Sequence, residues 1–405
     1  MPNIGKQSPT AREQTIGTVG VQPFRILAIV PGAFCFGLQN ITLALFERIS
    51  KEVPSHFLVT KWNDGEFPGR LRRLDIPFTE TWLGMFSRKL DWCNLRMTIE
   101  CLIKLPSAYV VLARLIRRFQ PTCIFLANHH EAILLWPMLL FLRKKVVCHL
   151  HDAPPAIPFQ KASYRIWRTG IGRFIFISQS ARARMAELGP IHQNDAVIWN
   201  GVEIRDLIVP RKRTNRFSTT FGWPADSLIV GMTGQMTPTK GHEDFIAAAA
   251  LVARANPRAR FVIGGKSIEP FFSTLRAQIA AEGLPGVIEF SGWAESASDF
   301  FDGIDLFVLA SRHDEGFGLV LAEAGERSLA SVATRSGGAI EIIVDGETGI
   351  LVKKTNPDEM ASAILKLLED EQLRQETGGR ARARVIEFFN LDRQAGKIKA
   401  FLAGI

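Results

Sequence analysis

Short apolar segments alternate with longer, helix-like segments along most of the chain. In the first half, FRILAIV (24–30), TCIFLANHH (122–130), KVVCHLHD (145–152) and GRFIFIS (172–178) are rich in β-branched and aromatic residues, as buried strands are. The last three of these segments end in polar residues, where a strand would leave its sheet. Because strands that alternate with helices are typical of parallel sheets, we expect an α/β fold.

The same alternation starts again near residue 227 and predicts a second domain. We expect two doubly wound, Rossmann-like domains, residues 24–200 and 227–385, that face each other across a cleft. The segment 201–226 is polar and charged, and it predicts the interdomain linker. Residues 1–23 lack the apolar core of a secretory signal and predict a loose tail, whereas residues 386–405 predict a C-terminal helix that packs back toward the first domain.

Charge distinguishes the two halves of the chain. The formal net charge of +9 divides into +12 for residues 1–200, with 25 basic and 13 acidic residues, and −3 for the remainder, with 24 and 27. A basic half predicts an anionic partner, such as an acidic acceptor, a lipid head group or an anionic membrane surface. The basic segments LARLIRRF (112–119) and FLRKK (141–145) suit such a partner, although basic helices are more often simply solvated faces.

Other composition features limit the class of protein. No nucleic-acid-binding motif is present, so no nucleic-acid partner is expected. All five cysteines lie in the first half without a CxxC pair, which predicts reduced thiols in a cytoplasmic protein, with the cytoplasmic face of the membrane as a second location. The apolar run at 132–142 contains a proline and is too short to span a bilayer, and it predicts a buried core segment.

The loop GMTGQMTPTKGHEDF (231–245) follows a predicted strand and precedes a predicted helix. Gly234 would permit a tight turn, and Lys240 would lie just before the helix, where free N–H groups and the ammonium both attract anions. The loop is neither a Walker loop nor a GxGxxG dinucleotide motif. It predicts a phosphate site, with an ordinary strand–helix connection as the alternative.

The segment SRHDEGFGLVLAEA (311–324) has two glutamates on either side of a glycine turn. Glu315 would lie in a loop, and Glu323 would lie one turn into a helix that begins near Gly318. The glycines permit close backbone approach to a phosphate, and the Glu323 carboxylate could accept hydrogen bonds from a ribose diol. The alternative is a pair of helix-start glutamates on a solvated face.

These segments together resemble the GT4 family of retaining glycosyltransferases, which have the GT-B fold. Residues 305–352 closely resemble the nucleotide-sugar-binding half of that family, whose glutamate–x7–glutamate motif matches Glu315 and Glu323. GQMTPTKG (234–241) is similar to the family's glycine–arginine–x4–lysine–glycine loop. WNGVE resembles its hinge motif, and FIFISQSARARM resembles its first-domain strand that ends in serine.

The resemblance implies a function for each matching residue. Lys240 would neutralise the departing diphosphate, Glu323 would hold the ribose, and Glu315 would contact the hydroxyls of the donor sugar. His151, in CHLHD, would orient a sugar hydroxyl or stabilise developing charge from across the cleft, although a histidine that ends a strand is often only a satisfied polar residue. Together these imply His151, Lys240 and Glu315 as catalytic residues. The implied donor-binding residues are Gly37, Gly234, Gln235, Lys240, Glu315, Gly316, Phe317, Gly318, Leu319, Val320 and Glu323.

The sequence departs from the family pattern at two positions. Gln235 stands where the family has an arginine, which removes one positive charge from the diphosphate site. Phe36 and Gly37 stand where the family has two glycines, so that Gly37 alone remains at the first-domain turn.

The implied reaction transfers a hexose-type sugar from a nucleoside-diphosphate sugar to an acceptor hydroxyl, with retention of anomeric configuration. A cell-envelope glycan, a lipid-linked glycan or a polysaccharide would be the acceptor, and no metal or other cofactor is expected. Two alternatives stay open. A GT-B sugar-nucleotide epimerase would need acid/base carboxylates in the first domain, and the missing arginine at Gln235 suits a catalytically weak nucleotide-sugar-binding protein.

Overall fold

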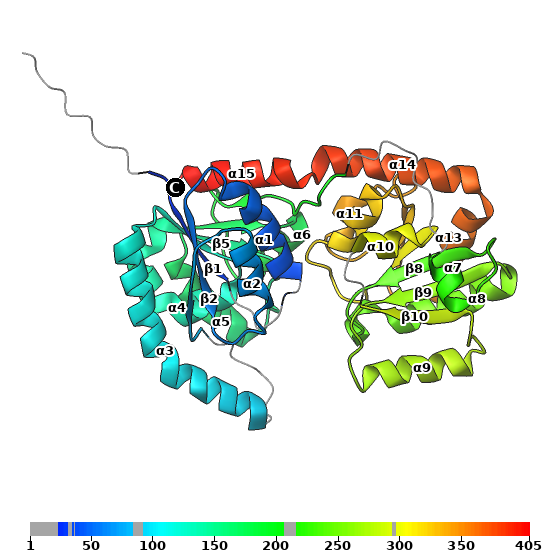
Figure 1. Cartoon of the computed structure of the whole chain (residues 1–405), viewed down its shortest axis with the longest axis horizontal. Helices are drawn as coiled ribbons and strands as arrows, with labels where there is room; N and C mark the ends of the chain where they lie inside the picture. Colours follow the sequence, from blue (N-terminus) through cyan, green and yellow to red (C-terminus); the bar gives the residue numbers. More distant parts are fainter. Residues whose placement is uncertain (1–22, 31–34, 36, 84–91, 206–215, 294–296) are drawn as a thin grey trace, which may run out of the picture.

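Two parallel sheets, each covered by helices, form the two domains of the chain (Figure 1). The computed structural model describes residues 23–30, 35, 37–83, 92–205, 216–293 and 297–405. The predicted tail lies outside the described residues except for Pro23, and so does the middle of the predicted linker. The two sheets confirm the expected pair of Rossmann-like domains.

The N-terminal domain contains seven parallel strands in the order β3-β2-β1-β4-β5-β6-β7. The strands are β1 (Ile26–Val30), β2 (Ser55–Thr60), β3 (Phe78–Thr81), β4 (Cys123–Leu126), β5 (Val146–Leu150), β6 (Arg173–Phe176) and β7 (Ala196–Val197). The chain winds outward from β1 in one direction and then returns to build the sheet in the other. This reversal leaves a crevice at the carboxyl ends of β1 and β4, where ligands bind in open α/β sheets.

The C-terminal domain repeats this plan with six strands in the order β10-β9-β8-β11-β12-β13. The strands are β8 (Leu228–Thr233), β9 (Ala259–Gly264), β10 (Ile288–Gly292), β11 (Leu306–Leu309), β12 (Ser331–Thr334) and β13 (Ile350–Val352). The corresponding crevice lies at the carboxyl ends of β8 and β11. The loops that leave these two strands contain Lys240 and Glu315, which the sequence predicts as donor-site residues.

Helices cover both faces of each sheet because the central strands are mostly apolar and buried along their whole length. Those of the N-terminal domain are α1 (Gly37–Ile49), α2 (Glu66–Arg73), α3 (Trp92–Phe119), α4 (His129–Leu142), α5 (Pro158–Trp167) and α6 (Gln179–Ala186). Those that follow are α7 (Arg216–Phe221), α8 (His242–Ala255), α9 (Phe271–Ala281), α10 (Ala297–Asp302), α11 (Leu319–Glu326), α12 (Ala339–Ile342), α13 (Pro357–Glu369), α14 (Glu371–Phe388) and α15 (Leu391–Ala403).

The predicted core segment at 132–142 lies within α4, where Ala132, Leu135 and Leu139 are fully buried. The structure therefore confirms that this segment contributes to a core. Among the helices that the structure describes, none combines the length and the apolar character that crossing a bilayer requires.

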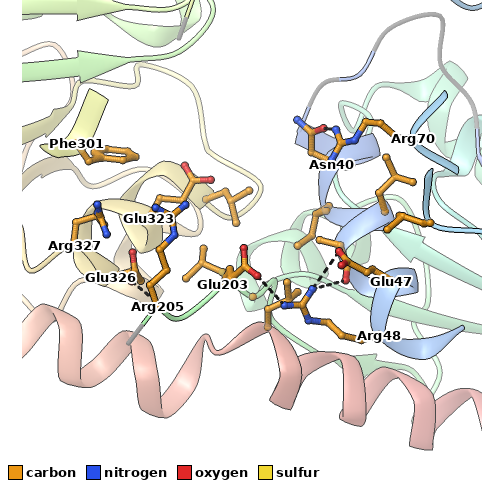
Figure 2. Close-up of a pocket in the computed structure, with 18 of the residues that line it drawn as sticks. Asn40, Glu47, Arg48, Arg70, Glu203, Arg205, Phe301, Glu323, Glu326 and Arg327 are labelled. Atoms are coloured by element: carbon orange, nitrogen blue, oxygen red, sulfur yellow. Dashed lines mark hydrogen bonds and ion pairs between the residues drawn. The ribbon is translucent and has the colours of Figure 1, made fainter. Parts of the chain in front are cut away.

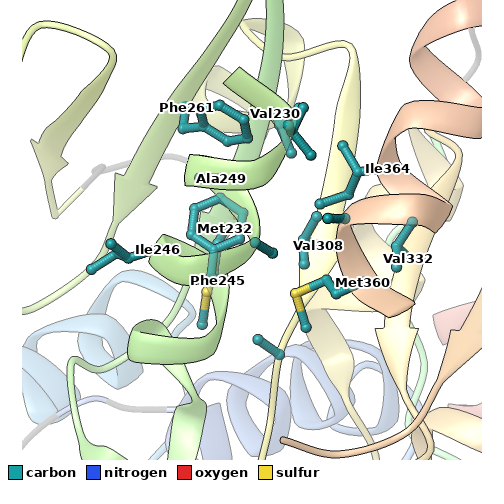
Figure 3. Packing of buried hydrophobic residues seen from close by; sticks show 14 of the residues in the cluster. Val230, Met232, Phe245, Ile246, Ala249, Phe261, Val308, Val332, Met360 and Ile364 are labelled. Atoms are coloured by element: carbon teal, nitrogen blue, oxygen red, sulfur yellow. The ribbon is translucent and has the colours of Figure 1, made fainter. Parts of the chain in front are cut away.

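The core of the C-terminal domain shows how its sheet and helices are held together. Figure 3 shows side chains of β8, β9, β11 and β12 packed against α8 and α13, which lie side by side on one face of the sheet. Phe245 of α8 and Phe261 of β9 meet edge to face, with 5.8 Å between ring centroids. Met360 and Ile364 of α13 are fully buried against the same cluster. This packing fixes α8, and with it the loop that precedes α8.

The last helices connect the two domains. In Figure 1, α14 runs along the C-terminal domain, and α15 continues the same line onto the N-terminal domain. On α15, Ala395, Ile398 and Leu402 join the apolar cluster that includes Ile41 and Phe46 of α1. The end of the chain is therefore part of the N-terminal core.

The chain crosses between the domains at residues 201–202 and again at 389–391, and these two crossings are hydrogen-bonded to each other. The N–H of Val202 donates to the carbonyl of Phe389 (2.8 Å), and the N–H of Leu391 donates to the carbonyl of Val202 (2.9 Å). Gly201 lies against Leu391, where a Cβ would approach the backbone within 2.5 Å. The two connections between the domains therefore run side by side.

Candidate functional site

The loops that follow β8 and β11 bring Lys240 and Glu315 together. Lys240 Nζ lies 2.7 Å from Glu315 Oε1 and 3.0 Å from Oε2, although 75 residues separate them in sequence. Ser311 Oγ donates a short hydrogen bond to the same carboxylate. Because β8 and β11 are neighbours in the sheet, their carboxyl ends place both side chains at the crevice of the C-terminal domain.

Backbone geometry at Gly241 holds Lys240 close to the sheet. Gly241 has φ +71° and caps α8, and a Cβ at this position would collide with the carbonyl oxygen of Ala310 at the end of β11. Lys240 immediately precedes this glycine in a single 3-10 turn, Pro238–Lys240. The ammonium and the free N–H groups of α8 therefore face the same region, as an anion site requires.

Arg312 connects the two loops on the side away from the Lys240–Glu315 pair. Its guanidinium donates to both carboxylate oxygens of Asp244 (2.6 and 2.7 Å) and to Glu243 (3.1 Å), both in the first turn of α8. The N–H of Arg312 also donates to the carbonyl of Thr239 (2.9 Å). A bidentate pair of this kind fixes orientation as well as distance, so the position of Lys240 depends on the β11–α11 loop.

The turn that contains Gly316 lies directly against the N-terminal domain. A Cβ on Gly316 would approach the carbonyl oxygen of His151 within 2.4 Å, so only glycine permits this approach. Ser178, which ends β6 and caps α6, donates from Oγ to the carbonyl of Gly316 (2.5 Å). Arg184 of α6 donates to the carbonyl of Asp314 (3.1 Å) and to Asp152 (2.7 Å). The domains therefore touch beside Glu315.

His151 is a neutral imidazole at this contact. Its Nε2 lies 3.2 Å from Nδ1 of His149, which is completely buried in β5. Burial lowers the pKa of His151 to about 4, and burial together with the neighbouring His151 lowers the pKa of His149 well below its usual range. At neutral pH His151 can therefore donate or accept a hydrogen bond, but it carries no charge.

Glu341 of α12 caps a helix of the other domain. Its carboxylate accepts hydrogen bonds from the N–H groups of Gln179 and Ser180 at the start of α6 (both 2.9 Å) and from Nε1 of Trp199 (2.8 Å). A carboxylate at a helix N-terminus accepts hydrogen bonds from the free N–H groups and interacts favourably with the helix dipole. No local pattern in the sequence reveals that Glu341 acts across the domains.

A cavity of about 380 Å³ lies between the domains on the hinge side. Figure 2 shows Glu323, Glu326 and Arg327 on the wall formed by the C-terminal domain, and Arg48 and Arg70 on the opposite wall. The cavity is lined by Asn40, Ile41, Leu43, Ala44, Glu47, Arg48, Arg70, Arg73, Leu74, Gly201, Val202, Glu203, Arg205, Phe301, Leu319, Glu323, Glu326, Arg327 and Leu391.

Glu323 has a strongly perturbed acidity in this cavity. Burial raises its pKa to about 7, against the opposing effect of the nearby Arg205 cation. Glu326, one turn further along α11, accepts a hydrogen bond from the N–H of Arg205 (3.1 Å). A carboxylate that titrates near neutrality and lines a cavity is a candidate for ligand contact.

The predicted site residues fall into two groups. Lys240 and Glu315 pair beside Gly316, which contacts the backbone of His151, whereas Glu323 and Leu319 line the cavity. The other predicted positions flank these groups. Gly234 and Gln235 follow β8, Gly318 caps α11 and Val320 lies in its first turn; Gly37 begins α1 with open space around it, and the side chain of Phe317 is buried against Phe389.

A metal ion would need a different set of side chains. Within the described ranges, no three His, Cys, Asp or Glu side chains gather closely enough to hold one. The side chains of Cys35, Cys101, Cys123 and Cys148 are buried.

Two protein-family models match successive parts of the chain. One, described as glycosyl transferases group 1, matches residues 214–384, and the other, described as Glycosyltransferase Family 4, matches residues 96–206. The chain belongs to the GT4-type glycosyltransferases of the GT-B fold. The first match covers the loops of Lys240, Glu315 and Glu323, and the second covers His151 and Ser178. The predicted family resemblance is thereby confirmed.

Curated relatives of this GT4-type protein act in glycan synthesis. The chain is 30% identical over 207 residues to the lipopolysaccharide core biosynthesis mannosyltransferase LpcC of Rhizobium leguminosarum bv. viciae, with 50% of this chain and 58% of that protein covered. It is also 30% identical over 219 residues to the phosphatidyl-myo-inositol mannosyltransferase of Mycolicibacterium smegmatis, with 53% of each chain covered. The chain spans about half the length of these relatives.

Solved structures match the whole GT-B fold. Anabaena HepE in complex with UDP and glucose superimposes with a TM-score of 0.75 at 19% identity, with 94% of this chain and 100% of that chain covered. WaaG, a glycosyltransferase involved in lipopolysaccharide biosynthesis, gives a TM-score of 0.69 at 14% identity, with 94% and 100% covered. These likenesses extend over both domains.

We expect Glu341→Ala to loosen the contact between the domains. The change leaves the N–H groups of Gln179 and Ser180 without their acceptor, so their hydrogen exchange should accelerate by roughly tenfold or more. Native-state hydrogen exchange measures this effect, and Glu347→Ala, an exposed carboxylate after the same helix, is the control. Equal exchange of the α6 N-terminus in both variants would contradict the capping function of Glu341.

Proposed function

We propose that this GT4-type protein is a retaining glycosyltransferase that transfers a hexose-type sugar from a nucleoside-diphosphate sugar to an acceptor hydroxyl. The observation that carries the proposal is the Lys240–Glu315 pair at the β8/β11 crevice, beside the turn at Gly316 that contacts the backbone of the neutral His151. A cation, a carboxylate and a neutral imidazole at one domain contact suit a diphosphate, sugar hydroxyls and an uncharged hydrogen-bond partner.

Exchange of ionic partners would accompany donor binding. In the structure, Glu315 neutralises Lys240. A diphosphate beside Lys240 supplies a stronger counter-charge, which releases the Glu315 carboxylate to accept hydrogen bonds from the donor sugar. The N–H groups at the starts of α8 and α11 would bind phosphate oxygens, because the free donors of a helix N-terminus attract anions.

The chemical step would need little acid catalysis because diphosphate is a good leaving group. The bond between the anomeric carbon and the diphosphate oxygen breaks, and Lys240 stabilises the charge that develops on the diphosphate. The acceptor hydroxyl attacks from the same face, and its proton passes to the departing phosphate oxygen. Retention then needs no second carboxylate within about 5 Å, in contrast to retaining glycosidases.

His151 would orient the donor sugar as a neutral group. Its low pKa keeps the imidazole uncharged at neutral pH, so it would not compete with Lys240 for the diphosphate. His149 fixes one ring nitrogen, which leaves Nδ1 of His151 for a sugar hydroxyl.

The donor and acceptor classes follow from the relatives and from charge. Relatives in lipopolysaccharide and phosphatidyl-myo-inositol mannoside synthesis support a glycan or lipid-linked acceptor for envelope or polysaccharide synthesis. HepE structures with UDP-glucose support a nucleotide sugar as donor. The basic first half of the chain suits an anionic membrane surface as a partner, so we place the reaction in the cytoplasm or on the cytoplasmic face of the membrane.

Lys240→Ala is expected to lower kcat/KM for sugar transfer by roughly 10²–10³, because one cationic contact to the leaving diphosphate is lost. The donor is first selected by thermal shift from UDP- and GDP-sugars, and transfer is then followed on lipid and oligosaccharide acceptors. Lys366→Ala, an exposed lysine of α13, is the control and should behave as wild type. Donor binding without transfer would leave only a binding protein, and epimerised donor in the absence of acceptor would indicate an epimerase.

The affinity for the selected nucleotide sugar should fall as pH decreases from 8 to 6. Glu323 with a pKa near 7 must lose its proton to accept both ribose hydroxyls, so the affinity should drop by about tenfold over this range. His151 and His242, whose pKa values lie near 4, stay neutral throughout. Calorimetric titration of wild type and Glu323→Gln provides the comparison. A pH dependence of equal size in Glu323→Gln would assign the titration to another group.

Transfer should persist in the presence of a chelator such as EDTA. Lys240 and the helix N-termini can supply the positive charge that a divalent ion supplies elsewhere. The measurement is kcat before and after dialysis against EDTA, with and without added Mg²⁺ or Mn²⁺. A loss of turnover that Mg²⁺ or Mn²⁺ restores would show that the reaction depends on a metal ion.

A further inference from the structure

Helix α3 is apolar on two opposite sides, and only one side is covered. Cys101, Ala108, Leu112 and Leu115 are buried against the N-terminal domain. At 100° per residue, a second apolar stripe lies on the opposite side of the same helix. Its members are large side chains exposed to solvent: Trp92, Leu95, Ile99, Leu102, Ile103 and Val110. We call these six residues the α3 stripe.

The α3 stripe is large for an exposed surface. It extends over about 27 Å of helix from Trp92 to Val110, and Trp92 and Ile103 are 81% and 72% exposed. Of the large apolar side chains that are exposed among the described residues, ten belong to the N-terminal domain and four to the C-terminal domain. Contiguous exposed apolar surface of this kind marks an interaction site in a soluble protein.

An aromatic and basic cluster lies next to α3. Lys104 of α3 places Nζ 3.8 Å from the ring centroid of Trp82 and 5.2 Å from that of Trp62, and these two tryptophans lie 5.2 Å apart. Lys61 approaches Trp82 from 5.5 Å. Half-buried tryptophans beside lysines are typical of side chains that occupy the boundary between water and lipid head groups.

The charge of α3 selects the partner of the stripe. The helix has five basic residues, Arg96, Lys104, Arg114, Arg117 and Arg118, and one acidic residue, Glu100, so its net charge is +4. Two copies of this helix would repel each other, whereas anionic lipid head groups would attract it. An amphipathic helix with Trp, Leu and Ile on one face and Lys or Arg beside them suits the membrane interface.

The geometry points to a membrane-docking face, and we propose that the α3 stripe inserts into the head-group region of a bilayer that contains anionic lipid. This face differs from the basic segments that the sequence suggested, because it consists chiefly of the apolar first half of α3. Figure 1 shows α3 on the outer side of the N-terminal domain, with its first turns extending beyond the other helices.

Docking through α3 would bring the reaction site to the membrane surface. Helix α3 leads from the carboxyl side of β3 to the amino end of β4, so its first turns lie toward the sheet edge that carries Gly37 and His151. The lipid-linked acceptor would then approach the cleft from the membrane surface that holds α3. This consequence for catalysis rests on the proposed glycosyltransferase function.

Co-sedimentation with vesicles tests the proposal. Wild-type protein should bind phosphatidylcholine vesicles that contain phosphatidylglycerol, and it should bind less at high salt and to phosphatidylcholine alone. The double variant Trp92→Ser/Ile103→Ser should bind roughly tenfold more weakly or worse, because the two most exposed side chains of the stripe are lost. Ile386→Ser, an exposed isoleucine on a helix of the C-terminal domain, should bind as wild type.

The remaining outcomes separate this inference from the proposed function. The thermal shift produced by UDP-glucose or GDP-mannose should be equal in wild type and in the double variant, which shows that the variant is folded. Failure of wild type to bind anionic vesicles, or a dimer that the double variant converts to a monomer without vesicle binding, overturns the docking proposal even where sugar transfer occurs. Vesicle binding that depends on the stripe supports docking even where no acceptor is glycosylated.

Discussion

The ion pair between Lys240 and Glu315 depends on the whole C-terminal domain being in place. Neither residue is near the other in sequence, and they meet because β8 and β11 are adjacent at the point where the strand order reverses. The packing of α8 and α13 on the sheet fixes one loop, and Arg312 joins it to the other. A fault in this core would displace the charged groups before it unfolded the domain.

Charged side chains around the cleft form ion pairs with one another. Lys240 faces Glu315, Arg312 faces Asp244, and Arg48 of α1 pairs with Asp392 (2.6 Å) and Glu203 (3.3 Å) near the hinge. A ligand that carries both anionic and hydroxyl groups would therefore exchange partners with these ion pairs. Partly buried charges held in this way avoid the full cost of desolvation.

The sequence predicts well those features that depend on neighbouring residues. Strand ends, the loop position of Glu315 and the start of α11 at Leu319 all follow from apolar runs and glycines. Strands β2, β3, β7 and β13 do not stand out in the same way, because they are short or mixed in character and their pairing is decided by the sheet.

Local sequence patterns also cannot predict the contacts between the domains. The cap that Glu341 provides for α6 and the approach of Gly316 to His151 arise only when two folded domains meet. The cavity that Glu323 lines also forms only where the two domains meet. Sequence identified these side chains as chemically suitable, but the distances between them belong to the tertiary structure.

The paired crossings at Val202 and Leu391 restrict how the domains can move. Two parallel segments joined by backbone hydrogen bonds behave as one strip, which bends more easily than it stretches or slides. Glu341 and Ser178 join the domains through side-chain hydrogen bonds, which can separate one after another. We therefore expect the two domains to rotate about residues 201–202 and 389–391, with the contacts at the start of α6 separating as they do so.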